Sequence, residues 1–194
     1  MDVKKINLAV LISGRGSNLQ ALIDACAEPS FPARISIVIS NIPGAYGLER
    51  AQQAGIETAT VHHKDYQGRE AFEAALLDTL DMYDIDLVCL AGFMRVLTPH
   101  FIDRWPDKLI NIHPSLLPDY KGLHTHERAL ADGKTEAGCT VHYVVPEMDS
   151  GPIIVQKRVP VLSADTPDTL AARVLEQEHA AYPEAVRKIA ESMS

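Results

Sequence analysis

The chain has 194 residues, of which 46% are hydrophobic, and its 26 acidic and 18 basic side chains give a formal net charge of -8. This length suits one domain or two closely fused lobes, and the composition is that of a globular protein and not of a disordered one. The acidic charge argues against nucleic acid or an anionic membrane as the main partner, and no stretch approaches the roughly 20 apolar residues of a membrane span.

The first half of the chain alternates strand-like and helix-like segments. Continuous apolar runs with β-branched residues are typical of buried parallel strands, and apolar residues three or four positions apart are typical of helices. Strands are predicted at 6–12, 34–40, 57–63, 86–92 and 108–113, and helices at 19–28, 48–55 and 69–83. This order predicts an α/β fold with a Rossmann-like, mostly parallel sheet and helices on both of its faces.

The second half of the chain no longer alternates strands and helices in this way. Segments 140–145 and 152–161 flank the turn PEMDSG, and this pattern predicts an antiparallel hairpin. A last helix is predicted to begin at Pro167, with Thr166 as its cap. Pro183 is expected to kink or restart that helix, because proline lacks the backbone N–H that a helix interior uses.

We expect two lobes that share one continuous sheet, an N-terminal phosphate- or nucleotide-binding lobe over 1–105 and a C-terminal lobe over 106–194. In open sheets of this kind, ligands bind beyond the carboxyl ends of the strands. The loops at those ends are 13–18, 41–47, 92–97 and 111–118.

The first of these loops, SGRGSN, joins the first strand to the first helix. Backbone amides at a helix N-terminus suit an anion, and Ser17 and Asn18 add side-chain donors. A tight turn capped by either residue explains the motif equally well. A dinucleotide is disfavoured because Leu19 replaces the third glycine and no acid stands about 20 residues further on. No Gly-Lys-Ser/Thr follows, so a phosphomonoester on a small metabolite fits better than a nucleoside triphosphate.

Two polar residues end the predicted strand in LINIHPSLLPDY. Asn111 and His113 lie two positions apart and therefore point to the same face. An amide can donate to a carbonyl oxygen that gains negative charge, and an imidazole can carry a proton near neutral pH. Asp149, in EMDSG, is a candidate carboxylate partner for the ring. A purely structural role for both residues, bonding nearby backbone groups, is the alternative.

Other histidines and the cysteines are predicted to be structural. Four histidines fall between residues 113 and 142, but their spacing matches no zinc motif, so no metal site is expected. His62 and His63 are expected to face solvent at a strand end. The odd, widely spaced cysteines predict reduced thiols in a cytoplasmic protein; they are Cys26, Cys89 and Cys139.

Six segments carry a family resemblance: SGRGSN, AGFMRVL, NIHPSLLPDYKGLHTHERAL, GCTVHYV, MDSGPII and QEHAAYP occur in this order. Together they resemble the glycinamide ribonucleotide formyltransferases, folate-dependent enzymes of purine biosynthesis, over almost the entire chain. The resemblance implies the formyltransferase fold, with a folate-binding and catalytic C-terminal lobe. It also implies transfer of the formyl group of 10-formyltetrahydrofolate to the primary amine of glycinamide ribonucleotide, without a metal.

The resemblance also assigns residues, position by position. It implies a catalytic trio of Asn111, His113 and Asp149. It implies that the ribonucleotide is bound by Gly16, Ser17, Asn18 and Glu178. It implies folate contacts from Arg69, Met94, Arg95, Val96, Leu97, Asn111, Glu147 and Met148.

Three other functions would use part of the same residues. Formylation of initiator tRNA would need a basic nucleic-acid-binding lobe, which is not apparent in this acidic chain. Deformylation, with water as acceptor, would leave a dedicated phosphate loop idle. A phosphometabolite-binding module without catalysis would have no reason to hold Asn111, His113 and Asp149 together. The expected partners are therefore small molecules, with the chain a monomer or a weak homodimer.

Overall fold

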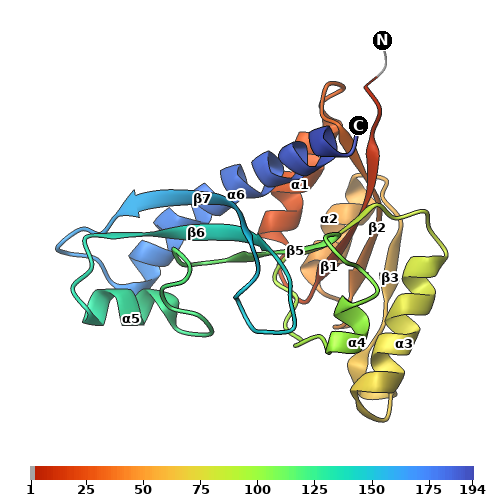
Figure 1. Cartoon of the computed structure of the whole chain (residues 1–194), viewed down its shortest axis with the longest axis horizontal. Helices are drawn as coiled ribbons and strands as arrows, with labels where there is room; N and C mark the ends of the chain where they lie inside the picture. Colours follow the sequence, from red (N-terminus) through yellow and green to blue (C-terminus); the bar gives the residue numbers. More distant parts are fainter. Residues whose placement is uncertain (1–2) are drawn as a thin grey trace.

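A seven-stranded sheet forms the centre of the computed structural model, which describes residues 3–194 (Figure 1). The strand order is β3-β2-β1-β4-β5-β6-β7; β1 to β5 pair in parallel, whereas β6 pairs antiparallel with both β5 and β7. The strands are β1 (Ile6–Ile12), β2 (Ala33–Ser40), β3 (Thr58–Thr60), β4 (Leu87–Leu90), β5 (Leu109–His113), β6 (Glu136–Tyr143) and β7 (Ile153–Pro160). The predicted fold class, a mostly parallel sheet followed by an antiparallel hairpin, is confirmed.

Helices connect and cover these strands. They are α1 (Ser17–Ala27), α2 (Tyr46–Gln53), the 3-10 turn η1 (His63–Asp65), α3 (Gly68–Asp81), α4 (Pro99–Ile102), α5 (Thr125–Ala131) and α6 (Pro167–Ser192). The short helices α4 and α5 were not predicted, and the third strand is shorter than expected because the chain turns into η1. Within residues 3–194, no helix is long and apolar enough to cross a bilayer.

The first strand shows how both faces of the sheet are covered. Leu8 and Val10 are fully buried in a cluster with residues of α1, α2 and α6, whereas Ala9 and Leu11 are fully buried in a second cluster with α3 and α4. Successive side chains alternate between faces, so burial on both sides makes the strand a continuous apolar run. Each large side chain buried in this way stabilises the fold by about 1.5–3 kcal/mol.

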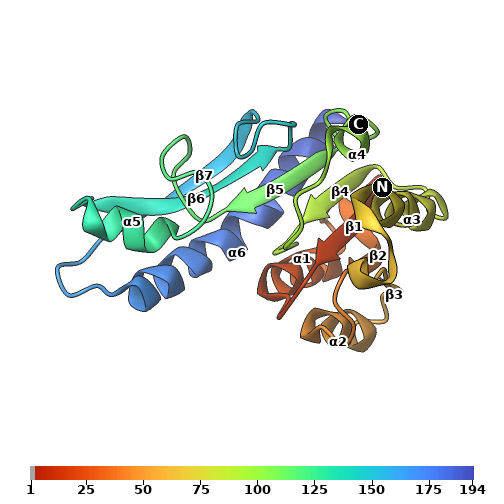
Figure 2. The same ribbon diagram turned by 90° about the horizontal axis from the view of Figure 1, so that it is seen from below.

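The last helix lies along β6 and β7 and reaches back to the first strands (Figure 2). Thr166 caps it by accepting the Thr169 N–H at 3.3 Å. The helix continues through Pro183 without a break, so the expected restart is wrong. Neighbouring residues such as Tyr182 and Val186 are fully buried against the sheet. We attribute the continuity to this packing, which outweighs the cost of about 3 kcal/mol for an interior proline.

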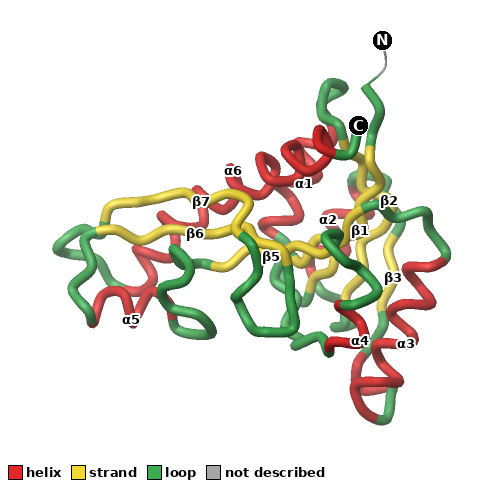
Figure 3. The backbone as a smooth tube through the Cα atoms, viewed as in Figure 1, coloured by secondary structure: helices red, strands yellow, loops and turns green. Residues whose placement is uncertain are grey.

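The predicted boundary between the lobes, after residue 105, falls between α4 and β5. The sheet runs through this point because β4 pairs with β5, from Val88 opposite Leu109 to Leu90 opposite Asn111. Figure 3 shows the strands as one band across the molecule. The division into two lobes remains a prediction, whereas the single sheet is observed.

Candidate active site

A cavity of about 720 Å³ opens where the first turn of α1 and the loops after β4 and β5 meet the loop after β6. Its volume falls within the range of about 300–1,000 Å³ that is usual for small-molecule sites. The structure therefore brings most of the predicted site residues together, although they are far apart in the sequence. Those that line the cavity are Asn18, Met94, Arg95, Val96, Leu97, Asn111, His113, Met148, Asp149 and Glu178.

Four predicted residues are not part of this lining. Gly16 and Ser17 directly precede Asn18, at the N-terminus of α1. Arg69 is exposed in the first turn of α3, and Glu147 is exposed in the loop after β6. The contacts assigned to these residues stay predictions.

The turn between β1 and α1 is packed tightly against the start of α2. The Gly47 N–H donates to the Gly14 carbonyl at 3.0 Å, and a Cβ at Gly16 would lie 2.7 Å from the Gly47 Cα. Gly16 also has a φ of 75°, which favours glycine. The Arg50 Nε–H donates to the Arg15 carbonyl at 2.8 Å, which places a guanidinium against the loop. A compact turn with free helix-terminal amides and a cation nearby suits an anion.

A buried polar pair joins α1 to α6 at the edge of the cavity. The Asn18 Nδ2 donates to the Glu178 Oε1 at 3.2 Å, and Glu178 is only 8% exposed. Burial raises the pKa of Glu178, and the hydrogen bond from Asn18 opposes this shift. The Asn18 Oδ1 is buried without a hydrogen-bond partner among the described residues. The pair therefore presents acceptors that suit hydroxyl or amine groups of a ligand.

Glu178→Gln should raise thermal stability at alkaline pH. The folded-state pKa of Glu178 lies above the ordinary value of 4.5, so the carboxyl favours folding below that value, and this contribution is lost as the pH rises through the folded-state pKa. The Tm of the variant should exceed that of the wild type by about 1–4 °C at pH 8 and approach it near pH 4.5. Thermal melts between these pH values test this, with the exposed Glu176→Gln as control. Equal Tm values at pH 8 would contradict it.

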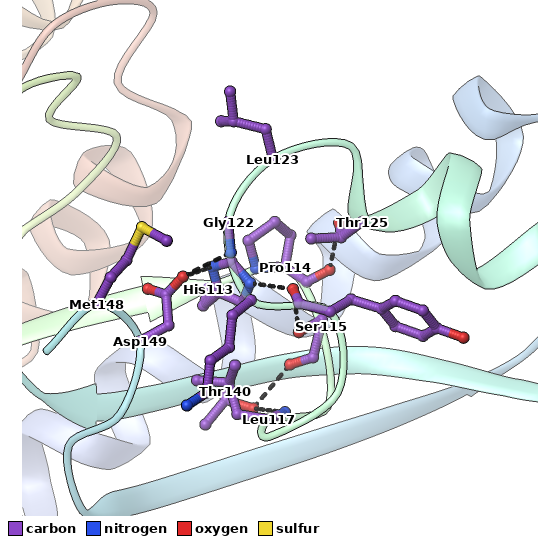
Figure 4. A network of polar contacts seen from close by, with 12 residues as sticks. His113, Pro114, Ser115, Leu117, Gly122, Leu123, Thr125, Thr140, Met148 and Asp149 are labelled. Carbon is purple, nitrogen blue, oxygen red and sulfur yellow. Dashed lines mark hydrogen bonds and ion pairs between the residues drawn. The ribbon is translucent and has the colours of Figure 1, made fainter.

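Asn111 and His113, the polar residues of the Asn-Ile-His segment, line the cavity from β5. His113 is 6% exposed, and each of its ring nitrogens faces an oxygen atom. The Nε2 lies 2.8 Å from the Tyr120 carbonyl oxygen, and the Nδ1 lies 3.6 Å from the Asp149 Oδ2. The Tyr120 carbonyl oxygen is an acceptor, so the Nε2 carries a proton and donates to it. The Asp149 carboxylate lies beyond hydrogen-bond distance of the Nδ1, which leaves this nitrogen available to a ligand. Figure 4 shows the Asp149 carboxylate directed at this ring.

Asp149 reaches the ring because β6 folds back along β5. Ile110 pairs with Tyr143, so β6 ends beside the start of β5, and the loop that follows reaches back along β5 until Asp149 lies 3.6 Å from the His113 Nδ1. The Asp149 Oδ2 also accepts the Gly122 N–H at 2.8 Å, as the dashed contacts in Figure 4 show. The Lys121 Nζ donates to the Ser150 Oγ at 2.7 Å and ties the same two loops together. The carboxylate is thus held by an amide and faces an imidazole.

His142 is a further polar residue of the site, considered in the sequence only as a metal ligand. It lies opposite Asn111 in the β5–β6 ladder. Its Nδ1 lies 2.9 Å from the Tyr143 carbonyl oxygen and therefore carries the proton in the neutral ring. Its Nε2 lies 4.0 Å from the Asp149 Oδ1 and has no hydrogen-bond partner within residues 3–194. Burial lowers the pKa of His142, which leaves an unshared electron pair facing the cavity.

Comparisons with known proteins agree in pointing to one family. Residues 6–186 match the formyl transferase family. Phosphoribosylglycinamide formyltransferase of Escherichia coli K12 is 52% identical over 92% of this chain and 84% of its own length. The trifunctional purine biosynthetic protein adenosine-3 of Homo sapiens is 51% identical over 97% of this chain, which spans 19% of that protein. The crystal structure of phosphoribosylglycinamide formyltransferase from Brucella melitensis superposes with a TM-score of 0.93, at 50% identity over 96% of each chain.

Proposed function

The chain belongs to the formyl transferase family, and from this premise we infer that it is an enzyme that transfers a formyl group to glycinamide ribonucleotide in purine biosynthesis. The product is formylglycinamide ribonucleotide. We propose 10-formyltetrahydrofolate as the donor. The observation that carries this function is the meeting of Asn111, His113 and Asp149 with the Asn18–Glu178 pair in one cavity. The other activities of the trifunctional relatives are not inferred for this chain.

The proposed reaction is an acyl transfer between two nitrogen atoms. The amine of the ribonucleotide attacks the formyl carbon, and the π electrons of the carbonyl bond move onto oxygen to form a tetrahedral oxyanion. Collapse of this intermediate breaks the bond to the folate N10, which gains a proton as the attacking nitrogen loses one. The Asn111 amide and the His113 Nδ1–H would donate to the oxyanion, and Asp149 would offset the charge of the ring.

The cavity offers different surfaces to the two substrates. We place the phosphate at the tight turn before α1 and the ribose beside Glu178, where free amides and acceptors are found. We place the pterin along the loop after β4. Met94 and Val96 in that loop are 70% and 64% exposed, and both line the cavity. Such exposed apolar side chains in a concave site suit the flat faces of a heteroaromatic ring system.

The proposed partners are small molecules, and the proposed location is the cytoplasm. The structure describes Cys26, Cys89 and Cys139 as free cysteines. Free thiols support a reducing compartment. Burial raises the pKa of Cys26 to about 11, so this thiol is protonated and unreactive near neutral pH.

An absorbance assay of the formyl-folate donor tests the function directly. The donor should lose its formyl group only when glycinamide ribonucleotide is present, and the formylated ribonucleotide should accumulate in equal amount. Donor loss at the same rate without the ribonucleotide would identify a deformylase instead. Binding of both ligands without any donor loss would identify a binding module and overturn the proposal.

A further inference from the structure

Ser13 directly follows β1, whose neighbours in the sheet are β2 and β4. Its Oγ accepts the Met94 N–H at 2.8 Å and donates to the Asn41 Oδ1 at 2.5 Å. These partners are 81 and 28 positions away in the sequence. The hydroxyl therefore joins the first residue of the SGRGSN turn to the loop after β4 and to the loop after β2.

The far end of this polar chain is also fixed. Asn41 is 2% exposed, and its Nδ2 lies 3.2 Å from the Nδ1 of His63, which begins η1. The expectation that His63 faces solvent is therefore wrong, because its ring is partly buried against Asn41. With Asn41 held on its other side, the Ser13 hydroxyl has a defined direction and cannot rotate freely.

The loop after β4 is anchored at two points. Ser13 holds the amide of Met94 at one end, and the buried carboxylate of Glu73 accepts the backbone N–H of Thr98 at 3.0 Å and its hydroxyl at the other. The side chain of Met94, at the first anchor, and that of Val96, between the two anchors, line the cavity. Ser13 is the first residue of the SGRGSN turn, where we place the phosphate, whereas Glu73 lies on α3. Only the Ser13 anchor therefore connects the loop after β4 to that turn.

We propose that Ser13 is a positioning residue that couples the ribonucleotide half-site to the folate half-site. This inference rests on the proposed function. A phosphate that orders the SGRGSN turn would fix the Ser13 hydroxyl and with it the amide of Met94. A pterin against the Met94 loop would fix the same hydrogen bond from the other side. Each ligand then raises the affinity for the other, and the two factors are equal because coupling is reciprocal.

Binding measured without turnover tests this coupling. Tetrahydrofolate has no formyl group to transfer, so its Kd can be measured by calorimetry under argon, with and without saturating glycinamide ribonucleotide. In the wild type, the ribonucleotide should lower this Kd by about three- to tenfold, the factor expected from the net contribution of one hydrogen bond. In Ser13→Ala the ratio of the two Kd values should fall to about one.

Two matched variants separate coupling from simple loosening of the loop. Thr98→Val removes the hydroxyl bond to Glu73 and should weaken tetrahydrofolate binding while the ratio stays at its wild-type value. Ser13→Thr keeps the hydroxyl and should also keep the ratio. If Ser13→Ala does not fold, Ser13→Cys serves in its place, because a thiol is a much weaker donor and acceptor.

A wild-type ratio of one, or a ratio unchanged in Ser13→Ala, would overturn the coupling. Neither result would contradict the proposed function, because formyl transfer by the wild-type enzyme would still be observed in the absorbance assay. Failure of the wild type to bind either ligand would overturn both the function and the coupling.

Discussion

Replacing His113 by alanine should lower kcat by about 10²–10⁴-fold, the range for loss of a positioned acid or base. The ring is nearly buried, its Nε2 faces the Tyr120 carbonyl, and its Nδ1 is turned towards Asp149. Because the Nδ1 forms no hydrogen bond at 3.6 Å from the carboxylate, it can present a proton to the developing oxyanion while the Nε2 keeps the ring in place. Because substrate affinity comes mainly from other surfaces of the cavity, both KM values should change far less than kcat. Steady-state kinetics with saturating co-substrate measure both quantities.

The control for this variant is a histidine outside the cavity. His100 is exposed on α4, so His100→Ala should keep wild-type kcat. The Tm of His113→Ala should remain within about 5 °C of the wild type, because Asp149 keeps its bond from the Gly122 amide. Wild-type turnover by a folded His113→Ala enzyme would remove this ring from the mechanism.

Much of the fold could be predicted from local patterns. The strand at residues 6–12 was assigned with its observed bounds because burial on both faces leaves an uninterrupted apolar run. The helix from Pro167 was found through its cap, which is a local feature. The helices α4 and α5 were missed because four and seven residues are too few to establish a helical period. Continuity through Pro183 depends on tertiary packing, which no local rule includes.

Local sequence patterns could likewise predict part of the candidate site, whereas the rest depends on tertiary contacts. Asn111 and His113 share a strand, so their common direction could be predicted from the period of two. The approach of Asp149 to His113 depends on the β5–β6 register, and the Asn18–Glu178 contact joins residues 160 positions apart. Neither contact can be predicted from local patterns, so each could be found only from the family resemblance or from the structure.

Three contributors to the site could not be found from the sequence, each for a different reason. Arg50 lies on α2 and donates to the backbone carbonyl of Arg15, which is 35 positions away in the sequence. No local pattern predicts this contact. The Tyr120 oxygen that contacts His113 is a backbone carbonyl, and every residue has one, so the side-chain sequence does not mark it. His142 faces the cavity because it pairs with Asn111 across two strands, and an antiparallel register cannot be fixed from strand composition alone.

Replacing Asn111 by alanine should reduce kcat by about 10²–10³-fold, the effect expected when one oxyanion donor is lost. The amide lies in the middle of β5, lines the cavity and stands two residues before His113, which ends the strand. Negative charge on the formyl oxygen is largest in the tetrahedral transition state, so the lost hydrogen bond should affect kcat much more than either KM. Steady-state kinetics with each substrate varied in turn separate the two effects.

Asn111→Asp should be impaired at least as strongly as Asn111→Ala above pH 6, because a carboxylate would place negative charge beside the forming oxyanion instead of a donor. Asn7→Ala is the matched control: it removes an amide that donates to the Asp84 carbonyl at 2.7 Å, near the amino end of β1, and should keep wild-type kcat. If Asn111→Ala raised KM for the formyl donor by the same factor as it lowered kcat/KM, with kcat unchanged, the amide would contribute to ground-state folate binding, and oxyanion stabilisation would have to come from other donors in the cavity.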